Sequence, residues 1–128
     1  MQGEPLRLTP VPFHQIDMDA FHRGLAAIRK RGPTAPTAAI LEALKERKAW
    51  LWEMPGGWFV GEKMHDTDGA HFNVWLMYTA HIEDQKQLFG ALKDIARAID
   101  CNSVQCRSAS RGYGRFFAVK EYVFEARI

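Results

Sequence analysis

The stretch that decides the fold is WLWEMPGGWFVGEKM, which runs from Trp50 to Met64. Both of its flanks are rich in aromatic and aliphatic side chains, which is typical of β-strands. Between them, Pro55-Gly56-Gly57 has the composition of a tight turn. We therefore expect an antiparallel hairpin made of two strands, Trp50–Met54 and Trp58–Met64.

A third strand is expected over His71–Thr79, after a polar loop over His65–Ala70 with Asp68-Gly69 as a turn. Successive side chains of a strand point to opposite faces. This alternation predicts Phe72, Val74, Leu76 and Tyr78 on one face and Asn73, Trp75 and Met77 on the other. Apolar residues on both faces indicate a central strand that is covered on both sides.

Helical spacing of apolar residues predicts three longer helices, Phe13–Lys30, Thr37–Lys48 and Ile82–Ile99. The last of them has the most regular apolar stripe, formed by Leu88, Leu92, Ile95, Ala96 and Ile99. Because Leu88 belongs to that stripe, we expect its side chain to point into the core.

The remaining segments complete the predicted order of elements. They are an edge strand over Leu6–Val11, a strand over Ser103–Ser108, a short helical turn over Ser110–Ala118 and a closing strand over Glu121–Arg127. The resulting order is β-α-α-β-β-β-α-β-α-β. It predicts an α/β (α+β) domain over residues 1–128, with a mixed, mostly antiparallel central sheet and helices on both faces.

Composition places the chain among ordinary globular proteins. Of its 128 residues, 47% are hydrophobic and 25% are charged, and the net charge is +2, which argues against disorder and against a nucleic-acid partner. We expect no membrane span and no signal peptide. The two cysteines, Cys101 and Cys106, lie at an odd offset, so we expect free thiols and a cytoplasmic location.

The predicted order of elements resembles the fold of the GCN5-related N-acetyltransferases. The resemblance covers nearly the whole chain and is strongest from Trp50 to Ile128. In addition, the segment Arg111–Phe117, followed by Glu121–Glu125, resembles the tail of small acetyltransferase-like proteins that bacteriophages often carry. The resemblance implies acetyl-CoA as co-substrate and transfer of an acetyl group to an amine.

In this family, acetyl-CoA lies where the fourth strand splays away from the fifth. By position, the backbone groups of Met77, Tyr78 and Thr79 would hold the pantetheine arm. The pyrophosphate would lie at the start of the next helix, where unpaired N–H groups favour an anion. The stretch that matches the family motif begins at Gln85 and ends at Phe89-Gly90, and Leu88 stands in the place of a glycine.

The resemblance also suggests catalytic groups. Many family members use a tyrosine to protonate the departing thiolate. The matching position is Phe117, so Tyr113, one helical turn earlier, is the candidate acid. Glu53 and Glu62 are strand carboxylates near the place expected for a base, and Glu53 is the preferred candidate.

Other interpretations stay open. The cluster His65, Asp66, Asp68 and His71 has the residue types of a metal site, but a polar loop is the preferred interpretation and we predict no metal. The expected partner is an amine acceptor, either a small molecule or a protein, and a homodimer is left open. The alternative function, motivated by Leu88 and Phe117, is a catalytically silent binding or accessory protein with the same fold.

Overall fold

The computed structural model describes residues 8–54, 56–79, 85–107, 118–120 and 123–127. Its strands are β1 Pro10–Val11, β2 Trp50–Met54, β3 Gly57–Asp66, β4 Gly69–Thr79, β5 Ser103–Arg107, β6 Ala118–Lys120 and β7 Val123–Arg127. Its helical elements are the 3-10 turn η1 Phe13–Gln15 and the α-helices α1 Met18–Arg29, α2 Thr37–Lys45 and α3 Gln85–Ala98. No helix in this part of the chain has the length and apolar character needed to cross a membrane.

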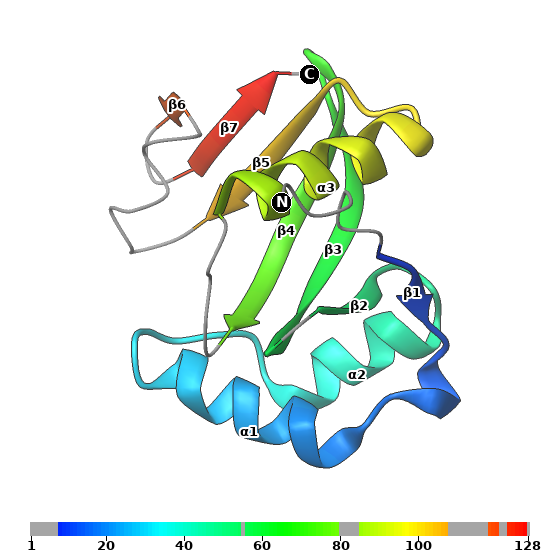
Figure 1. Cartoon of the computed structure of the whole chain (residues 1–128), viewed down its shortest axis with the longest axis vertical. Coiled ribbons are helices and arrows are strands. Elements are labelled where there is room, and N and C mark those ends of the chain that lie inside the picture. The colour runs from blue at the N-terminus through cyan, green and yellow to red at the C-terminus, as the bar shows by residue number, and fades with distance from the viewer. Residues whose placement is uncertain (1–7, 55, 80–84, 108–117, 121–122, 128) are drawn as a thin grey trace, which may run out of the picture.

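The strands form one seven-stranded sheet in the order β1-β2-β3-β4-β5-β7-β6 (Figure 1). Within the described pairings, β4 and β5 are parallel, and all other neighbours are antiparallel. Helix α3 connects β4 to β5, because a parallel pair needs a crossover. The predicted mixed, mostly antiparallel sheet is confirmed.

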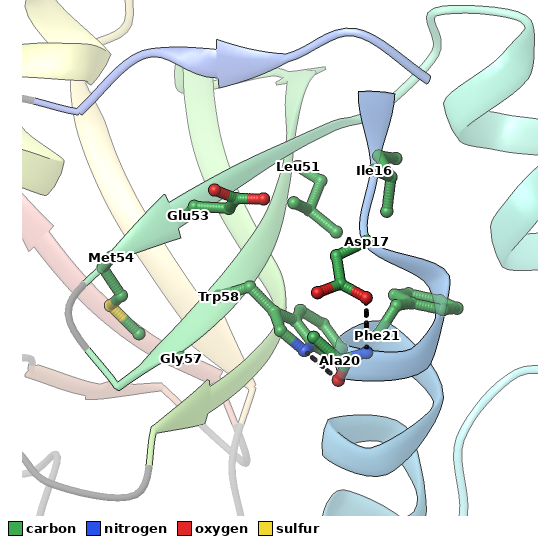
Figure 2. A pocket seen from close by; sticks show the side chains of 9 residues that line it. All are labelled: Ile16, Asp17, Ala20, Phe21, Leu51, Glu53, Met54, Gly57 and Trp58. Carbon is green, nitrogen blue, oxygen red and sulfur yellow. Dashed lines mark hydrogen bonds between the residues drawn. The ribbon is translucent and has the colours of Figure 1, made fainter. Parts of the chain in front are cut away.

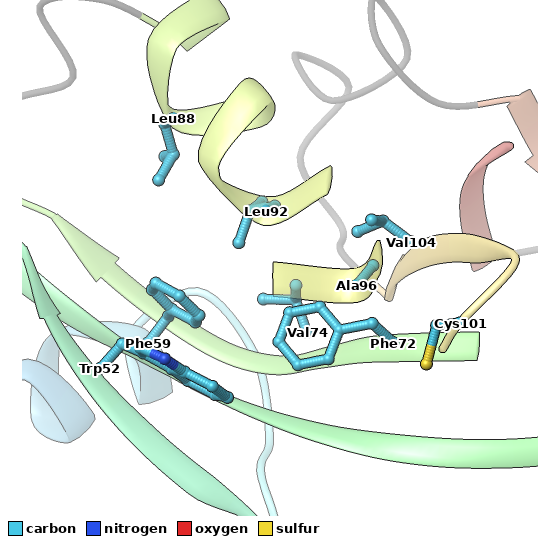
Figure 3. Close-up of a cluster of buried hydrophobic side chains, with 9 residues drawn as sticks. All are labelled: Trp52, Phe59, Phe72, Val74, Leu88, Leu92, Ala96, Cys101 and Val104. Atoms are coloured by element: carbon cyan, nitrogen blue, oxygen red, sulfur yellow. The ribbon is translucent and has the colours of Figure 1, made fainter. Parts of the chain in front are cut away.

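Each face of the sheet is covered by a hydrophobic core of its own. One core packs α3 against the sheet (Figure 3) and comprises Trp52, Phe59, Phe72, Val74, Leu88, Leu92, Ala96, Cys101 and Val104. The other packs α1 and α2 against the sheet and comprises Phe21, Leu25, Ile40, Leu44, Ala49, Leu51, Trp58, Val60 and Leu76. Neighbouring residues such as Trp58 and Phe59 enter different cores, as the strand period requires.

The hairpin of β2 and β3 forms where the sequence predicts it. The strands are antiparallel, and Met54 pairs with Gly57 at the closed end. Gly56 in the turn has a φ of 78°, which glycine adopts without steric cost.

The predicted alternation of side chains in β4 is wrong beyond Val74. Val60 pairs with Leu76 and Gly61 with Val74, so Trp75 is an extra residue and forms a β-bulge. The bulge reverses the alternation. Phe72 and Val74 pack in the α3 core, whereas Leu76 packs in the core of α1 and α2 and Tyr78 packs against that core.

The loop predicted over His65–Ala70 is also wrong. Strand β3 continues to Asp66 and β4 begins at Gly69, so the connection is the two-residue turn Thr67-Asp68. The Asp68 amide donates to Asp66 Oδ1 at 2.7 Å, and Gly69 takes a φ of 122°. Neither central residue of this turn is glycine. The hydrogen bond from the Asp68 amide to the Asp66 side chain stabilises the turn instead.

The ends of several other elements differ from prediction. The helix predicted over Phe13–Lys30 begins only at Met18, because Asp17 caps it and accepts a hydrogen bond from the Ala20 amide at 3.1 Å. Near the C-terminus, β6 is a strand that the sequence did not predict, and it includes Ala118. The rest of the predicted helical turn, 110–117, lies outside the described residues, as do residues 6 and 7 of the predicted first strand.

Gly61 has no room for a side chain. A Cβ built on it would lie 2.6 Å from Phe72 Cε1 and 3.2 Å from Trp52 Cζ3. Phe72 is fully buried and in edge-on contact with Trp52, so neither ring has space to retreat. We expect Gly61→Ala to lower the free energy of unfolding by about 1–3 kcal/mol, the usual cost of overpacking. Urea denaturation measures this loss, and an unchanged or higher stability would contradict it.

Candidate functional site

The C-terminal part of β4 carries three of the predicted site residues, Met77, Tyr78 and Thr79. On one side they pair with Phe59, Trp58 and Gly57 of β3. On the other side the described pairing with β5 runs only from His71↔Ser103 to Val74↔Cys106. Strand β4 therefore continues for five residues beyond the part of its pairing with β5 that the structure describes.

The other three predicted cofactor residues lie on α3, close to the end of β4 in sequence. Gln85 is the first residue of the helix, and Phe89 and Gly90 lie in its second turn. In an α-helix each N–H beyond the first turn bonds to the carbonyl four residues earlier. The amides of Phe89 and Gly90 are therefore used within the helix, whereas amides of a helix's first turn in general lack such partners.

The residues of α3 differ in how closely other residues pack against them. Leu88 is only 7% exposed and belongs to the α3 core, so its predicted core placement is confirmed. Phe89 is half-buried, and the Lys93 ammonium lies 4.5 Å from its ring centroid. A Cβ on Gly90 would meet no atom within 4 Å. The surface beside Gly90 is therefore open.

A cavity of about 230 Å³ lies between the start of α1 and the hairpin of β2 and β3 (Figure 2). It is lined by Ile16, Asp17, Ala20, Phe21, Leu51, Glu53, Met54, Gly57 and Trp58. Glu53, the predicted base, comes from β2, and Asp17 comes from the cap of α1. The cavity therefore combines two carboxylates with a largely apolar lining.

Trp58 forms a fixed wall of this cavity. Its indole Nε1–H donates to the carbonyl oxygen of Ala20 at 3.1 Å, and its ring lies 5.0 Å from that of Phe21 between centroids. The indole also lies against Gly24, where a Cβ would come within 2.7 Å of its Cε2. The hydrogen bond and the close packing hold the wall in one position.

The other catalytic candidates are not among the residues that line the cavity. Tyr113 and Phe117 lie outside the described residues. Glu62 is half-buried on β3, where Glu62 Oε1 accepts a hydrogen bond from Asn73 Nδ2 at 3.0 Å. Because Glu62 does not line the cavity, Glu53 is the described carboxylate that keeps the role of candidate base.

The buried side chain of His71 links three strands through hydrogen bonds to the exposed Asp66 and the buried Ser103. Its Nε2 lies 2.8 Å from Asp66 Oδ1, and its Nδ1 forms a hydrogen bond with the Ser103 hydroxyl. A carboxylate only accepts, so in the neutral ring Nε2 donates and Nδ1 accepts from Ser103. These are the residue types of a hydrolytic triad, but Ser103 is completely buried. We therefore interpret these hydrogen bonds as a structural link between β3, β4 and β5.

No three His, Cys, Asp or Glu side chains come together as ligands among the described residues. Cys101 is a free, buried thiol, and burial raises its pKa. A raised pKa lowers the thiolate fraction and hence the nucleophilicity of the thiol.

Sequence reasoning missed Asp17 and Trp58 as site residues. Asp17 carries a local signal, since aspartate is a preferred helix cap just before an apolar stripe. Its place on the same cavity as Glu53 has no local signal, because the two residues lie far apart in sequence and line one cavity only through the packing of α1 on the hairpin.

Comparison of the chain with protein-family models and with curated protein sequences finds no match.

Proposed function

We propose that the protein transfers an acyl group from an acyl-CoA to an amine, with the fold of the GCN5-related N-acetyltransferases. The observation that carries the proposal is the β4-α3-β5 unit, in which β4 pairs in parallel with β5 from His71 to Val74. This pair is parallel within an otherwise antiparallel sheet, and the crossover helix α3 begins soon after β4 ends. Strand ends and helix N-termini near a change in sheet order are common ligand sites in α/β proteins.

A helix N-terminus suits the phosphates of a CoA thioester, because amides of a first turn lack helical partners. Helix α3 follows β4 in the chain and begins at Gln85. Met77, Tyr78 and Thr79 would lie along the pantetheine arm, and Gln85, Phe89 and Gly90 would lie near the phosphates.

Acetyl-CoA would supply an activated acyl group as its thioester. The amine nitrogen would attack the carbonyl carbon, the carbon–sulfur bond would break, and the sulfur would leave as a thiolate. Glu53 is the proposed acceptor of the proton that the amine loses, directly or through water. Tyr113 is the proposed donor of the proton that the thiolate takes up. Positioning and charge stabilisation would supply most of the rate enhancement.

Titration calorimetry with acetyl-CoA tests the proposal. We expect saturable heat with acetyl-CoA and with CoA, and mass spectrometry should detect an acetylated product from a mixture of primary amines. ADP serves as the control for simple anion binding and should bind more weakly, because it lacks the pantetheine arm. Absence of heat at millimolar acetyl-CoA would contradict the proposal.

Gly90→Ala separates a cofactor contact from a loss of stability. Because open space surrounds Gly90 in α3, the substitution should raise the free energy of unfolding by about 0.5–1 kcal/mol. If the cofactor passes beside Gly90, the added methyl group should weaken CoA binding by about ten-fold. Unchanged CoA affinity in this more stable variant would remove Gly90 from the site.

A second candidate function is a binding or accessory protein that uses the same fold without catalysis. Leu88 favours it, because a core leucine takes the place where the family has a phosphate-binding glycine. Light scattering and pull-down experiments would then reveal a stable protein partner. Turnover of acetyl-CoA by an isolated monomer would contradict this candidate.

A further inference from the structure

The cavity between α1 and the hairpin has an uncompensated negative charge. Asp17 and Glu53 contribute carboxylates, and none of the nine lining residues is basic. Asp17 caps α1, so the N-terminal dipole of that helix offsets part of its charge. No hydrogen bond or ion pair joins the Glu53 carboxylate to another residue in the described part of the chain. A cation is therefore the ligand that this cavity favours electrostatically.

The other lining residues are apolar. They favour a ligand with an apolar part, and the volume of the cavity limits its size. Phe21, Leu51 and Trp58 are buried core residues that also border the cavity. The volume of about 230 Å³ is smaller than the ~300–1,000 Å³ typical of pockets for drug-sized ligands. Only a small molecule or the end of a side chain fits. Figure 2 shows the Glu53 side chain extending from β2 and the Asp17 side chain from the residue that precedes α1.

We propose that this cavity binds a small organic cation, a primary ammonium group on a short apolar stem. Glu53 and Asp17 contact the ammonium group, and Phe21, Leu51 and Trp58 contact the stem. Preorganisation favours binding, because the Trp58 indole is already fixed by its hydrogen bond to Ala20. A free amine and a lysine side chain share this chemistry, and the experiment below distinguishes them.

The position of the cavity connects it to the proposed reaction. Its residues Gly57 and Trp58 pair directly with Thr79 and Tyr78, and the rings of Trp58 and Tyr78 lie 6.4 Å apart between centroids. Neighbouring strands are only ~4.8 Å apart. The cation would therefore bind one strand away from the β4 residues assigned to the pantetheine arm. Its role as acyl acceptor rests on the proposed function, whereas its binding does not.

The test is a calorimetric titration of the full chain at pH 7 and low salt, without CoA. The probes are n-butylamine, n-butanol and butyrate, which share a stem and differ in charge. We expect saturable binding of n-butylamine and no binding of butyrate or n-butanol. Nα-acetyl-lysine methylamide is the fourth probe: stronger binding than n-butylamine assigns the cavity to a lysine side chain, and weaker binding assigns it to a free amine. Equal binding of n-butanol and n-butylamine would overturn the proposal.

Three variants locate the binding site. Glu53→Gln and Asp17→Asn each remove one charge, and asparagine caps helices as well as aspartate does, so α1 should stay folded. Each should weaken n-butylamine binding about three- to five-fold, the range for a partly exposed ion pair. Asp94→Asn is the control, because Asp94 is an exposed carboxylate on α3 that pairs with Arg97. Equal affinity in all three variants and the parent protein would overturn the assignment to this cavity.

The outcome is separable from that of the proposed function. Binding of n-butylamine without any heat from acetyl-CoA would leave the cation site in place and remove the acyltransferase proposal. Acetylation of amines by a protein that gives no heat with n-butylamine would leave the acyltransferase proposal in place and remove the cation site.

Discussion

Leu88→Gly is expected to lower the free energy of unfolding by about 3–6 kcal/mol. Replacing a buried leucine by a small residue costs about 2–5 kcal/mol, and glycine inside a helix costs about 1 kcal/mol more. Leu88 is buried against Phe59, Val74 and the other residues of the α3 core. Urea denaturation measures the change as a lower midpoint with an unchanged slope.

Leu88→Ala separates the two contributions, because alanine removes the packing and keeps the helix propensity. The free energy of unfolding of Leu88→Ala should therefore be about 1 kcal/mol higher than that of Leu88→Gly. Gly90→Ala, two residues further along α3, should change stability in the opposite direction. CoA affinity, measured at a temperature where Leu88→Gly remains folded, should match that of the parent protein. A loss below 1 kcal/mol together with tighter CoA binding would show that Leu88 borders a cofactor cleft.

Phe59→Ala is the second large change, with an expected loss of about 3–5 kcal/mol. Phe59 is completely buried in the α3 core, and its ring stacks on that of Trp52 with centroids 5.1 Å apart and planes 12° apart. Alanine would leave a void and also remove this aromatic contact, since the neighbouring strands cannot collapse into the space.

Trp50→Ala is the matched control for Phe59→Ala. Trp50 lies on the neighbouring strand β2, and it is 38% exposed. Replacing Trp50 by alanine should lower the free energy of unfolding by about 1 kcal/mol or less, because little packing is lost. Differential scanning calorimetry of both variants measures their unfolding temperatures. Similar unfolding temperatures for the two would contradict the assignment of Phe59 to the core.

Local patterns in the sequence determined the elements that depend on near neighbours. The hairpin of Trp50–Met64 follows from strand-forming residues on both sides of a Pro-Gly turn, and α3 follows from a regular apolar stripe. The mostly antiparallel sheet with a crossover helix follows from their order. Leu88 belongs with these successes, because its place in the stripe already predicted its burial.

Tertiary packing decided the rest. The bulge at Trp75 depends on the register between β3 and β4, and it placed Tyr78 beside Trp58 although simple alternation put Tyr78 with Phe72 and Val74. One extra residue reverses every later side chain, and no local preference announces it.

The cavity has the same origin. Asp17 is recognisable from sequence as a helix cap, and Glu53 as a strand carboxylate. Their placement on one cavity depends on how α1 packs on the hairpin, which the burial of Phe21 and Trp58 fixes. The sequence by itself determined the elements and their order, because turn chemistry and hydrophobic period are local. Only the tertiary structure decided which charges share a cavity, because that depends on contacts between residues far apart in the chain.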